Sequence, residues 1–71
     1  MEQGAFLLFY EQHKETLYHY ACTLTANAHQ AEDALQTAWL SCLRQEETFD
    51  ALPPDKRLAW MSVVVKNAAR S

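Results

Sequence analysis

The side chains best suited to catalysis or metal binding are His29, Glu32 and Asp33, whose i, i+3 and i+4 spacing would put them on one face of a helix. The chain offers no second His or Cys group to complete a metal site. Acidic residues are also favoured in the first turn of a helix, because they interact with its dipole. The sequence contains no Ser-His-Asp order, glycine-rich phosphate loop or C-x-x-C motif. We therefore predict no enzyme activity, no metal site and no cofactor.

A second group, Asp33, Gln36 and Leu40, is suited to contact with another protein. At about 100° per residue, these side chains fall on one line of a helix, nearly opposite that helix's apolar stripe. The stripe consists of Ala31, Leu35, Ala38 and Cys42. A carboxylate, an amide and a leucine turned away from the core predict a contact surface for a partner helix. The alternative is a broad core stripe that leaves Leu40 exposed by chance.

A third group lies near the end of the chain. Lys66 and Arg70 are one helical turn apart, and Asn67 sits between them at the edge of an apolar face. Two cations and an amide could meet phosphates and a base edge, since Asn suits adenine and Lys or Arg suits phosphate. The alternative is that the two cations only oppose the helix dipole.

Charge is unevenly distributed along the chain, whose net charge is −3. Over residues 1–55, nine acids face only Lys14 and Arg44, so this part carries −7. Residues 56–71 hold four bases and no acid, which gives +4. This polarity predicts one basic partner and one anionic partner, whereas the alternative is a chance cluster of surface charge.

Three amphipathic segments would position these groups. Helices are expected over about residues 4–25 and 28–45, because apolar or aromatic residues recur there in steps of three and four. The stripe of the first helix consists of Phe6, Tyr10, His13, Leu17, Tyr20 or Ala21, and Leu24. Asn27 and Gln30 predict a capping box at the start of the second segment. A third helix is expected over about 55–70. Its inward-facing residues are Leu58, Met61, Val64, Val65 and Ala68.

The remaining segment, residues 48–56, contains Pro53 and Pro54 and is predicted to be a loop with Phe49 tucked beneath it. A chain of 71 residues with one Gly can bury only one core and favours helices. We predict one all-α domain over residues 1–71, a compact three-helix fold. Its first two helices would be antiparallel, with the third packed across both.

Cysteine use and hydropathy indicate a cytoplasmic protein. Cys22 and Cys42 both fall in helical pattern and are predicted to be buried thiols. The longest apolar run, Ala5 to Tyr10, is far shorter than the roughly 20 residues of a membrane span. No basic region precedes that run, so a secretory signal peptide is not expected.

Taken in order, these motifs resemble region 2 of bacterial sigma factors of the sigma-70 family, in particular the extracytoplasmic-function type. The segment AEDALQTAWL (residues 31–40) is similar to the family's A-E-D-x-x-Q-x-x-F/W-L motif. FLLFYEQH (residues 6–13) resembles the opening helix of that domain. WMSVVVKN (residues 60–67) resembles the family's W-L-x-x-I-A-x-N, with Met and Val in place of Leu and Ala.

The resemblance implies a transcription initiation factor domain with two contact surfaces. It implies that the second helix docks on the clamp helices of the largest subunits of core RNA polymerase. The residues given that role are Asp33, Gln36, Thr37 and Leu40. It also implies that the third helix captures bases of the separated non-template strand of the promoter −10 element. We expect these bases to enter a pocket between residues 48–56 and the third helix. The residues given DNA contact are Lys66, Asn67, Arg70 and Ser71, the last standing where the family has an Asp.

Two alternatives stay open at this point. The chain could be a helical protein–protein interaction module that never touches DNA. As a sigma domain, it is expected to be part of a longer protein, while a region-2-only protein with a separate −35-binding partner is the other choice. An anti-sigma factor that masks the domain is a further expected partner.

Overall fold

Four α-helices and one 3-10 turn make up the part of the chain that the computed structural model describes, residues 4–70. The elements are α1 (Gly4–Leu24), α2 (Ala28–Arg44), α3 (Glu46–Ala51), the 3-10 turn η1 (Pro54–Lys56) and α4 (Arg57–Arg70). The all-α prediction is confirmed. The three long helices begin and end within two residues of their predicted bounds.

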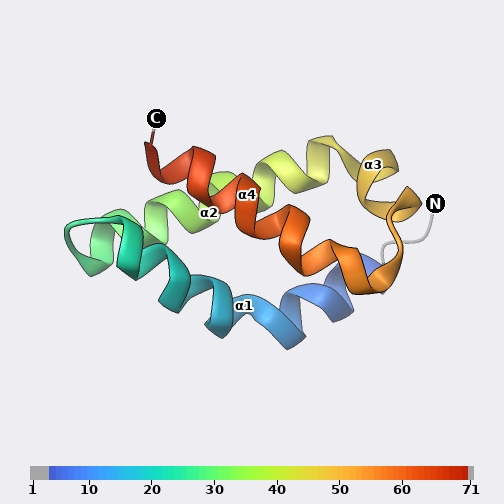
Figure 1. Cartoon of the computed structure of the whole chain (residues 1–71), viewed down its shortest axis with the longest axis horizontal. Coiled ribbons are helices and arrows are strands. Elements are labelled where there is room, and N and C mark those ends of the chain that lie inside the picture. The colour runs from blue at the N-terminus through green and yellow to red at the C-terminus, as the bar shows by residue number, and fades with distance from the viewer. Residues whose placement is uncertain (1–3, 71) are drawn as a thin grey trace.

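The three long helices pack side by side along the long axis of the molecule (Figure 1). Helix α1 runs in one direction, α2 returns antiparallel to it, and α4 lies across both, as predicted. The 21 residues of α1 span about 31 Å at 1.5 Å per residue, which accounts for most of the 36 Å length of the domain. Helix α3 lies at the end of the bundle where α1 begins (Figure 1).

The start of α2 is fixed by the predicted side-chain cap. The side-chain oxygen of Asn27 accepts a hydrogen bond of 2.9 Å from the backbone N–H of Gln30. The Gln30 side chain reaches back to the N–H of Ala26 at 3.1 Å, one residue earlier than in a standard capping box. The first bond satisfies a backbone N–H of the first helical turn, which has no partner within the helix. The second satisfies the backbone N–H of Ala26, which precedes the helix.

The prediction of a loop over residues 48–56 is wrong. Residues 46–51 form α3, and η1 follows directly after the first proline. Two acids begin α3, where the helix dipole favours them, and Phe49 is only 1% exposed. The prolines act more locally than predicted: Leu52 and Pro53 are extended, while Pro54 starts η1, where a missing N–H costs nothing.

One apolar core joins all four helices. Its largest fully buried side chains are Phe49, Leu17, Met61, Val65 and Cys42. Several predicted core positions differ: Leu35 is only half-buried, and both Leu24 and Cys22 are exposed. Phe9, which lies outside the predicted stripe, is buried instead. The first helix presents a broader face to the core than one row of residues, because two helices and α3 pack against it.

Candidate functional site

The exposed side of α2 carries a row of four residues, which we call the α2 ridge: Asp33, Gln36, Thr37 and Leu40. All four are exposed, and their directions span about 100° of the helix circumference. Leu40 is 51% exposed although it is a large apolar residue. The carboxylate of Asp33 and the amide of Gln36 form no hydrogen bond or ion pair within residues 4–70. The polar atoms of the ridge are therefore available to a partner.

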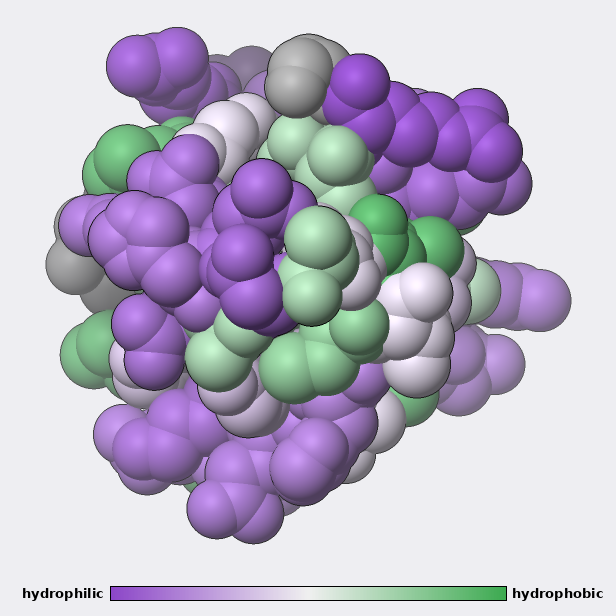
Figure 2. All heavy atoms as spheres, turned by 90° about the vertical axis from the view of Figure 1, so that its left-hand side faces the viewer, coloured by the Kyte–Doolittle hydropathy of each residue, from purple (hydrophilic) through white to green (hydrophobic). Residues whose placement is uncertain are grey.

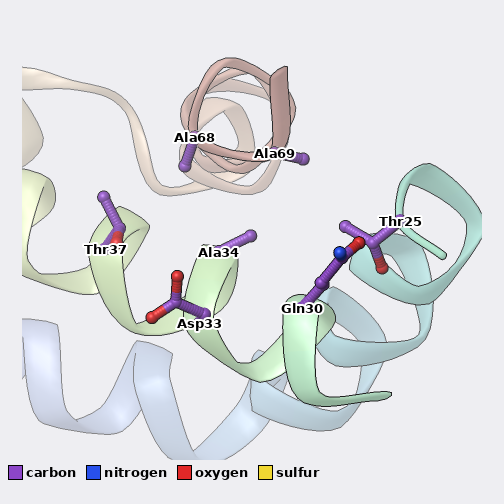
Figure 3. A pocket seen from close by; sticks show the side chains of 7 residues that line it. All are labelled: Thr25, Gln30, Asp33, Ala34, Thr37, Ala68 and Ala69. Carbon is purple, nitrogen blue, oxygen red and sulfur yellow. The ribbon is translucent and has the colours of Figure 1, made fainter. Parts of the chain in front are cut away.

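A polar pocket of about 360 Å³ borders the ridge on the side of α4 (Figure 3). Asp33 is the one charged residue among those that line it. The lining residues are Thr25, Gln30, Asp33, Ala34, Thr37, Ala68 and Ala69. Thr37 and Ala68 point toward each other across the gap between α2 and α4 (Figure 3). A carboxylate beside hydroxyl and amide groups makes this hollow suited to a cationic side chain.

A more apolar pocket borders the ridge on the opposite side, toward α1. It has a volume of about 380 Å³. Its lining residues are Tyr10, Glu32, Leu35, Gln36, Trp39 and Leu40. Gln36 and Leu40 thus belong to both the ridge and this pocket, while Tyr10 brings in the neighbouring helix. The ridge therefore has chemically different hollows on its two sides.

The predicted DNA-contacting residues occupy the outer side of the last turns of α4. Asn67 and Arg70 are exposed and Lys66 is half-buried. Arg70 falls between the other two in direction, because it is about 40° from Lys66 and 60° from Asn67 around the helix. Neither cation forms an ion pair within residues 4–70. Ser71, the remaining predicted contact, lies outside the described residues.

Asn67 lies in a hollow between α2 and α4, not beside residues 48–56 as we predicted. This hollow of about 290 Å³ also contains Thr37, Ser41 and Gln45 of the α2 side. Asn67 is ten residues after Arg57, so helical rise separates it by roughly 15 Å from the end of α4 that follows η1. The two predicted surfaces therefore meet: Thr37 of the α2 ridge and Asn67 of α4 line one hollow.

Sequence reasoning missed the role of Arg57. Its Nε donates a 3.0 Å hydrogen bond to the Phe49 carbonyl, and its Nη2 donates one of 3.3 Å to the Asp50 carbonyl. The guanidinium also lies 4.5 Å from the centre of the Phe49 ring. Carbonyls at the end of a helix lack internal partners, so Arg57 ties the end of α3 to the start of α4. Only the helical conformation of residues 46–51 reveals this contact.

Comparison with protein-family models identifies the sequence. The model of sigma-70 region 2 matches residues 9–71, which is nearly the whole chain. The chain belongs to the sigma-70 region 2 family. Comparisons with curated proteins and with solved structures find no significant match. Sigma-70 region 2 is a transcription initiation factor domain that takes part in RNA polymerase binding and promoter recognition, and it is not an enzyme.

Across residues 4–70, no helix is long and apolar enough to cross a membrane. In the same part of the chain, no three His, Cys, Asp or Glu side chains are grouped as metal ligands would be. The three residues considered above as possible metal ligands are exposed on the first turns of α2: His29, Glu32 and Asp33.

Proposed function

We propose that this sigma domain is of the extracytoplasmic-function type, and that its α2 ridge docks on the clamp helices of the largest subunits of core RNA polymerase. The outer side of α4, with Lys66, Asn67, Arg70 and the following Ser71, would then contact the −10 element of the promoter. This function implies a cytoplasmic location, where the polymerase acts. An anti-sigma factor would inhibit the domain by covering the α2 ridge.

The observation that carries the proposal is the exposure of Asp33, Gln36 and Leu40 together on the one side of α2 that faces away from the core. Together, an exposed leucine, an amide and a carboxylate on one helix face supply both the apolar and the hydrogen-bonding groups of a protein interface. A partner helix would bury the leucine and pair the polar groups. The −7 charge of residues 1–55 supports a basic partner for this surface.

Binding to core RNA polymerase tests the docking half of the proposal. We expect Asp33→Ala and Gln36→Ala each to weaken binding by about 2 kcal/mol or more, because each would leave an interfacial polar group unpaired. Asp50→Ala and Gln12→Ala are matched controls, since both residues are exposed on other helices. Equal affinities for all four variants and the parent would contradict the assignment of the ridge.

The DNA half of the proposal is supported by the charge of the C-terminal segment. The +4 charge of residues 56–71 is opposed by −7 elsewhere, so duplex binding by the domain alone should be weak and only slightly salt-dependent. A separated single strand is the better ligand, because its bases are already unpaired. Asn67, at the edge of a hollow, would carry base preference.

Fluorescence anisotropy with single-stranded −10 oligonucleotides and core polymerase tests this half. Asn67→Ala should reduce discrimination between sequences by about 1–3 kcal/mol. Lys66→Ala and Arg70→Ala should weaken binding to every sequence alike, because cations meet phosphates. If all three behave as the parent while polymerase still binds, the domain is an interaction module without direct DNA contact, and the DNA half is wrong.

A further inference from the structure

The pocket between α1 and α2 is built on an aromatic cluster rather than on the ridge alone. The Tyr10 ring lies 4.8 Å from that of Trp39, and Phe6 and Phe9 pack on the same indole at 5.6 and 6.0 Å. Leu35 and Leu40 complete the apolar wall of the pocket. Because three rings hold the indole, the pocket keeps its shape without an occupant.

Trp39 also carries a polar atom that the fold leaves unsatisfied. Its side chain is 8% exposed, and its indole Nε1 is buried with no hydrogen-bond partner within residues 4–70. A buried N–H without an acceptor costs free energy, and native proteins rarely keep one. Because this nitrogen is not accessible from the surface, Trp39 offers the pocket its ring and not its N–H.

The charges around the pocket indicate what kind of partner fits. Glu32 lines the pocket, and Asp33, which follows it in sequence, belongs to the adjoining α2 ridge. The nearest cation of α1, Lys14, is already engaged: its Nζ lies 3.3 Å from the Glu11 carboxylate and 5.5 Å from the Tyr10 ring centre. The rim of the pocket is therefore acidic, and it favours a partner with a basic residue beside an apolar one.

The spacing of the lining residues favours a helical partner. Glu32 and Leu40 are eight residues apart on α2, roughly 12 Å along the helix axis. A partner helix that lies along α2 would present side chains at matching intervals, two turns apart on one face. One of these would be apolar and enter the pocket beside Trp39, while the other would be basic and reach Glu32.

We propose that the Tyr10–Trp39 pocket is an anchor site for an aliphatic side chain from a basic helix of core RNA polymerase. Helix α1 thereby takes part in docking through Tyr10, outside the α2 ridge. The inference rests on the proposed function of the ridge and extends the docking surface to the neighbouring pocket. Gln36 and Leu40 connect the two surfaces because they belong to both.

Polymerase affinity separates this inference from the proposed function itself. Tyr10→Ser should weaken binding of the domain to core polymerase at least about tenfold, as expected of an anchor residue. Tyr20→Ser is the matched control, because Tyr20 is also a half-buried tyrosine of α1 that packs against the core, but it does not line the pocket. Circular dichroism would show how much helix each variant retains.

A photocrosslinking experiment keeps the inference testable if Tyr10→Ser does not fold. p-Azidophenylalanine in place of Tyr10 keeps an aromatic ring on Trp39 and should crosslink to a large subunit of the polymerase, whereas the same group in place of Tyr20 should not. If Asp33→Ala weakens binding but the two tyrosine positions behave alike, the pocket inference fails and the ridge stands. If Asp33→Ala and Gln36→Ala both bind as the parent does, the docking half of the proposed function fails as well.

Discussion

The two ends of the helical bundle are packed with different side chains. At the end where α1 begins, rings from α1, α2, α3 and α4 meet around Phe49 and Trp39. At the opposite end, where α1 turns into α2, the buried residues are alanines. These are Ala21, Ala31 and Ala34, with Ala68 half-buried beside them. Seen from that end, the surface shows a small moderately hydrophobic cluster ringed by hydrophilic side chains (Figure 2).

This difference assigns different tasks to the two ends. Large rings fill space between helices and can hold a short element such as α3, which has only six residues. Small residues let helices approach closely and leave hollows lined by polar groups, such as the pocket beside Asp33 (Figure 3). The aromatic end should therefore hold most of the stability, while the alanine end should be sensitive to added volume.

Among these variants, removal of the Phe49 ring at the aromatic end should lower the free energy of unfolding most. Phe49→Ala would remove contacts to Phe6, Phe9 and Trp60 and the stacking of Arg57. We expect a loss of about 3–5 kcal/mol, comparable to the whole stability of a domain of this size. Thermal melts followed by circular dichroism should therefore show a mostly unfolded variant at room temperature.

A milder variant and a second site control this result. Phe49→Leu keeps an apolar side chain and should retain a cooperative melt. Leu35→Ala should cost less than Phe49→Ala, because Leu35 is only half-buried and borders a pocket. A melting curve for Phe49→Ala that overlays the parent would mean that the aromatic end does not hold the fold.

A larger side chain at the alanine end should destabilise the domain. Ala31 is a fully buried core residue of α2, so Ala31→Leu must push the packed helices apart or strain its rotamer. We expect a loss of about 1–3 kcal/mol in denaturant unfolding. Ala28→Leu, at an exposed position of the same first turns, should change stability by no more than about 0.5 kcal/mol. Equal midpoints for the two variants would show that the alanines do not set the helix spacing.

The same contrast explains what the sequence could and could not predict about the fold. Periodicity located the three long helices because each buries one face, and the Asn27 cap is a local signal. Helix α3 was not predicted because six residues are too few to show a helical period. The loop prediction also extended the helix-breaking effect of Pro53 and Pro54 to residues that precede them. Burial of Phe9 and exposure of Cys22 depend on which helices pack together, which no local pattern contains.

The candidate site also has features that the sequence could predict and features that it could not. The α2 ridge could be predicted because an outward line on one helix follows from spacing alone. The pocket with Tyr10 could not, since Tyr10 and Trp39 are 29 positions apart in sequence and meet only when α1 and α2 pair. The meeting of Thr37 and Asn67 likewise depends on how α4 crosses α2.

The reactivity of the two cysteine thiols tests the difference between the two ends. Cys42 is buried at the aromatic end, and burial, with a smaller contribution from the Asp50 charge, raises the pKa of its thiol to about 11. Cys22 is exposed on α1. At pH 8 a disulfide reagent should therefore modify Cys22 rapidly in the folded domain and reach Cys42 only on unfolding. Equal rates for both thiols would mean that the aromatic end opens readily.

The raised pKa of Cys42 also predicts a pH effect on stability. Because the folded pKa lies above the unfolded value near 9, the neutral thiol stabilises the fold below about pH 9, and this contribution of at most about 3 kcal/mol is lost as the pH rises through 11. Denaturant unfolding over this range should show a steeper decline for the parent than for Cys42→Ala. Cys22→Ser should retain most of the parent's slope.

The smallest effect should come from the cap at the alanine end. Asn27→Ala removes the acceptor for the Gln30 N–H and should cost about 1 kcal/mol, a typical value for an N-cap. Asn27→Asp keeps the acceptor and adds a charge that the helix dipole favours, so its denaturation midpoint should equal or exceed that of the parent. The corresponding change at the aromatic end, Arg57→Lys, loses the two guanidinium hydrogen bonds to the end of α3 and the cation–π contact with Phe49, so it should cost more. If Asn27→Ala proved the more damaging of the two, the alanine end, with its side-chain cap, would hold the domain together more firmly than the ring cluster does.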